Sequence, residues 1–209
     1  MADLNAAMHP SREGPGRPRS AEASTAILDA AFSLLGEKGY AGVSVDAIAR
    51  RAHVSKATLY RRWPSKAELV VAALAQAPPL GPPPGRDLES DLVALIEDYL
   101  AIAEATPLGT ALPALVAESA RDPELARALA PLVRDRGAPL RNAFARGVVR
   151  GEIPPAADLD LALRLCLGPF VSRVFDAPAA TRSDDVRRVV RITLAGLRHE
   201  AAAKGDSDA

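Results

Sequence analysis

The spacing of apolar positions along the chain predicts helices and no strands. Between residues 20 and 37 apolar side chains recur at the 3.6-residue period, on the face formed by Ile27, Ala30, Ala31, Leu34 and Leu35. We expect Gly36 and Gly39 to close this helix. No stretch alternates with a period of two. The sequence therefore predicts an all-α protein.

Three shorter helices are expected next. The hydroxyl of Ser44 can cap a helix over residues 45–52, and a third helix is predicted from Ser55 to about residue 63, where Pro64 ends it. Ser65 and Glu68 have the spacing of a capping box, which opens a fourth helix to about residue 77. The pattern is typical of a small three- or four-helix domain.

A run rich in proline and glycine, residues 78–86, indicates a stiff linker and a domain boundary. We therefore divide the chain into a flexible arm (1–19), a first helical domain (20–77), the linker (78–86), a second helical domain (87–202) and a tail (203–209). In the second domain helices are predicted at 87–105, 109–119, 123–130, 132–150, 158–175 and 183–202. Pro131, Pro139 and Pro169 are expected to break or kink their segments.

Composition adds a charge asymmetry and few constraints on chemistry. Residues 1–77 contain ten Lys or Arg against seven Asp or Glu, which leaves sixteen against nineteen for the rest of this 209-residue chain. A basic first part favours a polyanionic partner. Aromatic residues make up 4% of the chain, so its core must rest on Leu, Val and Ala. Cys166 is the single cysteine and no apolar run is long enough to span a membrane, so we expect a cytoplasmic protein.

The strongest functional signal lies between residues 44 and 69. Two short helices are joined by a turn of about three residues, the arrangement in which a helix-turn-helix protein inserts its second helix into the DNA major groove. No acidic residue lies between Asp46 and Glu68. Six cations fall within seventeen residues of this stretch: Arg50, Arg51, Lys56, Arg61, Arg62 and Lys66. This spacing and charge favour DNA binding over the alternative of a solvated, charged helix pair.

Residues 39–69 resemble the DNA-binding domain of the tetracycline-repressor (TetR) family. The matching positions are Ser44, Ile48-Ala49, Val54-Ser55, Leu59-Tyr60, Trp63 and Ser65-Lys66. The resemblance is close over roughly residues 20–75, and beyond them it lies only in the helical plan. It implies a homodimeric DNA-binding regulator with a C-terminal domain for dimerisation and ligand sensing.

The resemblance also implies roles for individual residues. Ser44, Tyr60 and Lys66 resemble the family's phosphate contacts, whereas Lys56, Ala57, Thr58 and Arg61 occupy positions that face the major groove. We include Arg62 among the expected DNA contacts. Ser55 is expected to cap the third helix, with a base contact as the alternative. Leu59 and Trp63 follow the buried spacing and are expected to pack inside.

Two features depart from the simple pattern. The turn position that family members usually fill with Gly is His53, which we expect to adopt a positive φ. Before the first helix, Arg17 and Arg19 flank Pro18 in a segment that can enter a DNA minor groove if its backbone is extended. The alternative is a tail without a role.

Two helices of the second domain are candidates for a dimer interface. Residues 159–171 are apolar almost all round, and the last helix has a stripe of Val186, Val189, Val190, Thr193, Leu194 and Leu197. Two such helices from each chain would form a four-helix interface about a twofold axis. The interface residues expected on this basis are Leu163, Phe170, Val174, Val190, Leu194 and Leu197. Packing within one monomer is the alternative.

For a ligand pocket the sequence offers only candidates. They lie on helices expected to line the core: Tyr99, Thr106, Thr110, Asn142, Phe144, Cys166 and Phe170. Ordinary packing is the alternative at each position. The resemblance implies a small-molecule inducer and a palindromic double-stranded DNA operator, without identifying either.

Three other classes of function are compared with this interpretation of the sequence. No nucleotide-binding, phosphate-loop or hydrolase motif is present and the three histidines are far apart, so no enzyme, cofactor or metal site is expected. A constitutive architectural DNA binder would lack sequence preference. An activator would share every feature above, and repression is favoured only because it is the family's usual mode.

Overall fold

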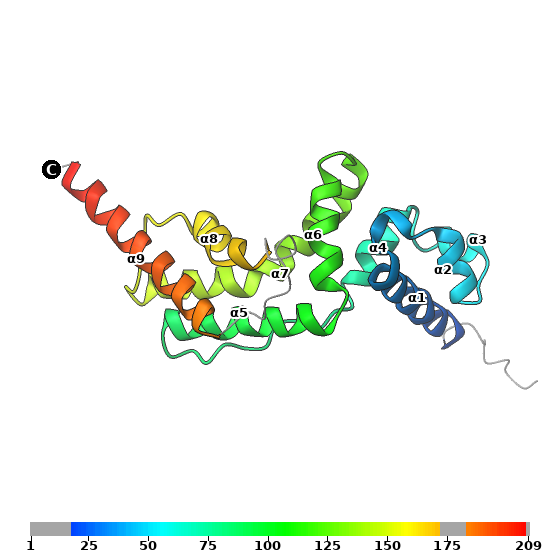
Figure 1. The fold of residues 1–209 in the computed structure, drawn as a ribbon, viewed down its shortest axis with the longest axis horizontal. Helices are drawn as coiled ribbons and strands as arrows, with labels where there is room; N and C mark the ends of the chain where they lie inside the picture. Colours follow the sequence, from blue (N-terminus) through cyan, green and yellow to red (C-terminus); the bar gives the residue numbers. More distant parts are fainter. Residues whose placement is uncertain (1–17, 172–182, 208–209) are drawn as a thin grey trace, which may run out of the picture.

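The computed structural model of the chain describes residues 18–171 and 183–207, and all regular structure within these ranges is helical (Figure 1). The helices are α1 (Pro18–Gly42), α2 (Val45–Arg51), α3 (Lys56–Tyr60), α4 (Lys66–Leu74), α5 (Leu88–Ala105), α6 (Leu108–Ser119), α7 (Pro123–Val149), α8 (Leu159–Val171) and α9 (Ser183–Ser207). The all-α prediction is confirmed. Helices α1–α4 lie at one end of the molecule and α8 and α9 at the other, with α5 and α7 running between them (Figure 1).

The borders of α1 differ from the prediction at both ends. The helix begins at Pro18, so Arg19 lies in its first turn and not in an extended arm, whereas Arg17 lies outside the described residues. At the other end Gly36 is helical, and the break falls at Gly39, whose φ of 63° only glycine adopts at little cost. The minor-groove prediction for Arg19 required an extended backbone and is wrong in that respect.

Helix α7 is one continuous helix of 27 residues, where two helices were expected. Pro131 and Pro139 lie inside it, and each removes a backbone donor at a typical cost of about 3 kcal/mol. Burial on both sides of Pro131 opposes this cost. Leu125 and Leu129 are buried before it, and Leu140 and Phe144 after it. Packing in two cores therefore overrides the local signal to break.

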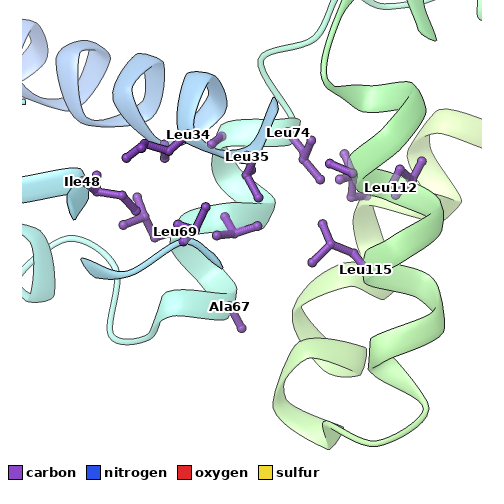
Figure 2. Close-up of a cluster of buried hydrophobic side chains, with 14 of the residues drawn as sticks. Leu34, Leu35, Ile48, Ala67, Leu69, Leu74, Leu112 and Leu115 are labelled. Atoms are coloured by element: carbon purple, nitrogen blue, oxygen red, sulfur yellow. The ribbon is translucent and has the colours of Figure 1, made fainter. Parts of the chain in front are cut away.

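The first hydrophobic core joins α1–α4 to α6 and to the N-terminal half of α7. Leu35 of α1 and Leu69 of α4 are each 1% exposed, and they belong to the same cluster as Leu115 of α6, which is fully buried. Figure 2 shows Leu115 directed from α6 toward the side chains at the α1–α4 end of the molecule, and Leu112 belongs to the same cluster. The expected boundary at residue 77 therefore does not separate two cores.

The second core is formed by α5, the C-terminal half of α7, α8 and α9. Phe144 and Cys166 are fully buried in it, as is Val190 of α9. Gly147 allows α5 and α7 to approach closely, because a Cβ atom there would lie 2.5 Å from Leu88 Cδ2. Leu80 of the linker packs against both cores.

The linker contains no helix, as predicted, but carboxylates of α5 bond it to the part of the molecule formed by α5–α9, which we call the body. Asp98 accepts a hydrogen bond from Gly81 N at 2.5 Å, and Asp91 accepts one from Gly85 N at 2.6 Å. Asp91 is completely buried, and its second oxygen lies 3.4 Å from Arg146 Nη2 and 3.8 Å from Arg150 Nη2. A buried carboxylate needs such partners, so Asp91 fixes the linker to α5 and α7.

We expect Asp91→Ala to lower the free energy of unfolding by about 2–3 kcal/mol, because hydrogen bonds to a charged group are lost while both arginines remain partly hydrated. Urea denaturation followed by circular dichroism measures this. Glu89→Ala is the matched control, since Glu89 is an exposed carboxylate on the same helix, and it should change stability by less than about 0.5 kcal/mol. Equal effects of the two substitutions would contradict the role given to Asp91.

Candidate nucleic-acid interface

Local hydrogen bonds explain why the segment from residue 44 to residue 60 folds as two short helices. Ser44 Oγ accepts a hydrogen bond from Ala47 N at 3.2 Å, which caps α2. Ser55 Oγ accepts one from Thr58 N at 3.2 Å and pairs with the Thr58 hydroxyl at 3.0 Å, which caps α3. The capping roles expected for both serines are confirmed.

The turn between the two helices has the expected backbone. His53 has a φ of 53°, the only positive φ at a non-glycine position among the described residues. Its side chain is exposed, and a residue in this conformation costs about 1–2 kcal/mol. The caps on either side and the core below hold the turn in this strained form.

Buried side chains fix the rotational orientation of α3 about its own axis, and so determine which of its side chains face solvent. Leu59 is 1% exposed and packs in the first core with Ile48 of α2, and Trp63 packs against the same core. The packing roles expected for Leu59 and Trp63 are confirmed. The opposite side of α3 therefore faces solvent, with Lys56, Ala57, Tyr60 and Arg61 all exposed, and the Tyr60 side chain is 50% exposed. Thr58 and Arg62 are only half-exposed.

Arg51 is held by side chains of α1. Its Nη1 and Nη2 lie 2.5 and 3.0 Å from the two carboxylate oxygens of Glu37, and Nη1 also donates to Ser33 Oγ at 3.2 Å. The hydrogen bonds from Arg51 hold the pKa of Glu37 below its ordinary value. This fork orients α2 on α1, while the neighbouring Arg50 is exposed and no ion pair of Arg50 occurs among the described residues.

Lys66 has an intramolecular partner as well. Its Nζ donates to the carbonyl oxygen of Tyr40 at 2.8 Å and lies 4.1 Å from the centroid of the Tyr40 ring. Partial burial lowers the pKa of Lys66. The first turn of α4 is thereby fastened to the chain just after the break at Gly39, beside α2.

Lys56 forms an ion pair with Asp46, with 2.5 Å between Nζ and Oδ1. The Lys56 and Asp46 side chains are 59% and 46% exposed, so water screens the pair and its contribution to stability is at most about 1 kcal/mol. Lys56 can therefore leave Asp46 for a stronger partner at small cost. The pair links the first turn of α3 to the first turn of α2.

The expected dimer-interface residues lie inside the monomer. Phe170, Val190, Leu194 and Leu197 are between 0 and 6% exposed and belong to the second core, and Leu163 packs against it. Phe170, Val190, Leu194 and Leu197 have almost no surface left to bury against another chain, so these four predictions are wrong. Leu163 is only half-buried, so its place in a dimer interface stays a prediction, and Val174 lies outside the described residues. Among the described side chains of α8 and α9, the large apolar ones that are exposed are Leu161, Leu165 and Ile192.

The expected ligand-lining residues do not gather around one cavity. Thr110 and Asn142 are exposed, which contradicts their expected place in the core, while Phe144, Cys166 and Phe170 fill the second core. Tyr99 and Thr106 are half-buried, and Thr106 bonds the carbonyl oxygen of Ile102. None of them lines the three described cavities.

Arg136 was not predicted from the sequence as a functional residue. This residue follows Leu132 and precedes Leu140 at helical spacing, on the buried face of α7. A cation within an apolar stripe was the signal that could have singled it out. Its guanidinium contacts the end of α4, as described below.

Within the described residues no single helix is long and apolar enough to cross a membrane. The same ranges contain no group of three or more His, Cys, Asp or Glu side chains placed to hold a metal ion. The site that the described residues do form is a pair of capped helices, α2 and α3, in which the second helix is exposed and carries cations. This is the arrangement of a helix-turn-helix DNA-binding transcription regulator.

Comparison with known proteins agrees with this class and gives the family. Residues 27–73 match the family of bacterial regulatory proteins named tetR, and residues 82–193 match the tetracyclin repressor-like C-terminal domain. The second match alone spans more than half of the chain. The protein belongs to the TetR family of non-enzymatic DNA-binding transcription regulators.

Relatives and solved structures extend the match to most of the chain. An uncharacterised HTH-type transcriptional regulator of Mycobacterium bovis is 35% identical over 184 residues, which cover 87% of this chain and 88% of the relative. A DNA-binding transcriptional repressor, TetR, of Mycobacteroides abscessus is 35% identical over 73% of this chain and 90% of its own. The crystal structure of the TetR-family regulator SCO0332 is 27% identical and superposes with a TM-score of 0.65, covering 84% of this chain and 98% of its own.

We expect Asp46→Asn to strengthen DNA binding by up to about fivefold, because the pair that Lys56 must break is worth at most about 1 kcal/mol. Fluorescence anisotropy with labelled DNA measures the affinity. Glu68→Gln is the control for simple loss of negative charge, since Glu68 is exposed and makes no ion pair within the described residues. In a Lys56→Ala background the Asp46→Asn gain should disappear. A gain that persists there would show that the pair does not restrain Lys56.

Proposed function

We propose that this protein is a homodimeric repressor that binds an inverted-repeat DNA operator and releases it on binding a small molecule. The observation on which the proposal rests is the exposed side of α3. Lys56, Ala57, Tyr60 and Arg61 are all exposed there, while Leu59 anchors the opposite side in the core. The Mycobacteroides abscessus relative is named a repressor, which supports repression over activation.

The candidate DNA contacts on α3 and beside it have two kinds of chemistry. Arg61 and Lys56 can donate to the O6 and N7 atoms of guanine, and the methyl group of Ala57 suits that of thymine. The hydroxyls of Tyr60 and Ser44 and the ammonium of Lys66 suit phosphate oxygens, which fix the register without reading the sequence. We assign base contacts to the first group and phosphate contacts to the second. Thr58 and Arg62, only half-exposed, would contact DNA at the edge of this surface.

Dimerisation would use the faces of α8 and α9 that the second core leaves exposed. Leu165 is 49% and Ile192 63% exposed, so both keep apolar surface that a second chain could bury. Gly168 and Gly196 lie on the same helices, and a Cβ atom at either would meet nothing within 4 Å. These features support close packing against the same helices of a second copy about a twofold axis.

The arrangement in one chain fits this assembly. α8 and α9 lie at the end of the molecule opposite α3 (Figure 1). A dimer joined at that end would hold two α3 helices apart, related across the twofold axis and at the same level along it. Such a dimer reads two half-sites separated by about 34 Å, one turn of DNA, or by a longer spacing.

Selection of bound sequences from random duplex DNA, at two salt concentrations, tests the proposed function. We expect a single inverted repeat that is still enriched at the higher salt concentration. A featureless pool whose binding collapses with salt would contradict sequence-specific regulation and favour the architectural alternative.

Tyr60→Phe and Arg61→Ala separate the two kinds of contact on the selected operator. Tyr60→Phe should weaken binding about equally on every operator variant, because only a phosphate contact is lost. Arg61→Ala should relax the preference at one base position in each half-site, by about 1–3 kcal/mol, and Lys56→Ala at another. Affinity measurements on single-base operator variants test both. A changed base preference in Tyr60→Phe would reverse its assignment.

Leu165→Asp and Ile192→Asp should each weaken self-association at least about tenfold, because each places a charge in an apolar interface. Sedimentation velocity over a range of protein concentrations measures this. Val149→Asp is the control, because Val149 is 87% exposed at the end of α7 and lies outside the proposed interface. Unchanged association in both α8 and α9 variants would show that the dimer forms elsewhere.

A further inference from the structure

A cavity of about 280 Å³ lies where the DNA-binding helices meet the body. It is a partly open pocket lined by the segment just after α4, the start of the linker and α7. Pro79, Leu80, Leu132 and Pro139 form much of its wall, and Arg136 and Asp135 supply its charged groups. The volume is close to the lower end of the range for small-molecule sites.

Arg136 joins α7 to the C-terminal end of α4 through three backbone carbonyls. Its Nη1 donates to Pro78 O at 2.7 Å, and its Nη2 donates to Ala77 O at 2.5 Å and to Leu74 O at 3.4 Å. Carbonyls at the end of a helix lack helical partners and carry partial negative charge, so a cation is favoured there. We call this set of contacts the Arg136 clamp.

The cation of the clamp has no ionised partner. No ion pair of Arg136 occurs among the described residues, and its neighbour Tyr99 is a neutral phenol at ordinary pH. Burial accordingly lowers the pKa of Arg136 and raises that of Tyr99. A half-buried guanidinium bonded only to neutral acceptors, on the wall of a cavity, is suited to bind an anion.

We propose that this cavity binds a small organic carboxylate, whose acid group draws Arg136 away from the carbonyls of α4. Charge-assisted hydrogen bonds from Arg to a carboxylate are roughly twice as strong as those between neutral groups. Both terminal nitrogens of the guanidinium are committed to carbonyls. A carboxylate that binds Arg136 through two parallel N–H groups must therefore displace at least one of them.

The remaining walls set the rest of the ligand's chemistry. They are apolar side chains of Leu and Pro, so an apolar group attached to the carboxylate would be accommodated. Asp135 is the one acidic side chain of the lining, and it is exposed, so water weakens its repulsion of an anion. The ligand class is thus a short-chain or single-ring carboxylic acid.

The consequence for DNA rests on the function proposed above. α4 packs on α1 and holds the chain beside α2 through Lys66, so a shift at its C-terminal end changes the position of α3. Because the two binding equilibria are linked, the carboxylate and DNA would weaken each other's affinity by the same factor. Arg136 acts here as a positioning residue and does not contact DNA.

The first test measures ligand binding without DNA. Wild-type protein, Arg136→Gln, Arg136→Lys and Arg134→Gln are titrated with butyrate, hexanoate and benzoate, and with the corresponding amides, at constant ionic strength. Arg134 is the matched control because it is an exposed arginine on the same helix. At least one acid should bind wild type and Arg134→Gln about tenfold or more tightly than its amide, and Arg136→Gln should lose this preference. Arg136→Lys should lose most of it, because an ammonium lacks the fork.

Binding of no acid, equal binding of acid and amide, or undiminished binding in Arg136→Gln would each overturn the proposal. Asp135→Asn should leave acid binding unchanged or strengthen it, and a loss there would equally contradict it. Circular dichroism shows whether each variant is folded. If Arg136→Gln does not fold, Arg136→Lys takes its place: loss of most of the preference for acid over amide supports the proposal, and an undiminished preference overturns it.

The second test asks whether the ligand opens the clamp. The amide of Gln76 donates to Ala73 O at 3.1 Å and that of Ala77 to Leu74 O at 3.2 Å, so their hydrogen exchange reports on the end of α4. The bound acid should speed exchange at both amides in wild type, and slower or unchanged exchange would overturn the proposal. Operator affinity is measured separately. Absence of specific DNA binding would refute the proposed function and leave the ligand result standing.

Discussion

The packing of α4 on α7 and of α1 on α6 is the constraint on which the rest of the structure depends. Leu69 and Leu74 of α4 share one core with Leu112 and Leu115 of α6, so the DNA-binding helices are packed directly on the body (Figure 2). Helices α1–α4 form too small a unit to bury a large core alone, and the added leucines of α6 and α7 enlarge it. The roll of α3, set by buried Leu59, is therefore fixed relative to the whole molecule and not only to its own domain.

This shared core also explains how a change in the body can alter DNA binding. α7 contributes to both cores without interruption, and the buried Asp91 of α5 contacts both the linker at Gly85 and Arg146 of α7. The Arg136 clamp adds a polar contact at the edge of the same junction. Apolar packing gives this junction its stability, while the clamp is the part of it whose partners an ionised ligand can exchange.

The sequence predicted what depends on neighbours within a few residues. The caps at Ser44 and Ser55 and the positive φ of His53 follow from local hydrogen bonds and local sterics, and all were confirmed. Apolar spacing also predicted that Val190 and Leu194 are buried, but spacing cannot tell which surface buries them. The dimer prediction failed for that reason, since these side chains fill their own monomer's core. The unbroken α7 was missed because only packing at a distance opposes Pro131.

The central claim is that the DNA-binding helices and the body fold as one unit, and equilibrium unfolding tests it directly. Trp63 is the only tryptophan and packs against the first core, so its fluorescence reports on the DNA-binding end. Circular dichroism reports on all the helices, most of which lie in the body. In urea, at one protein concentration, the two signals should change together with the same midpoint and slope. A Trp63 transition at lower urea than the loss of helix would show that the DNA-binding end unfolds independently, and would contradict the claim.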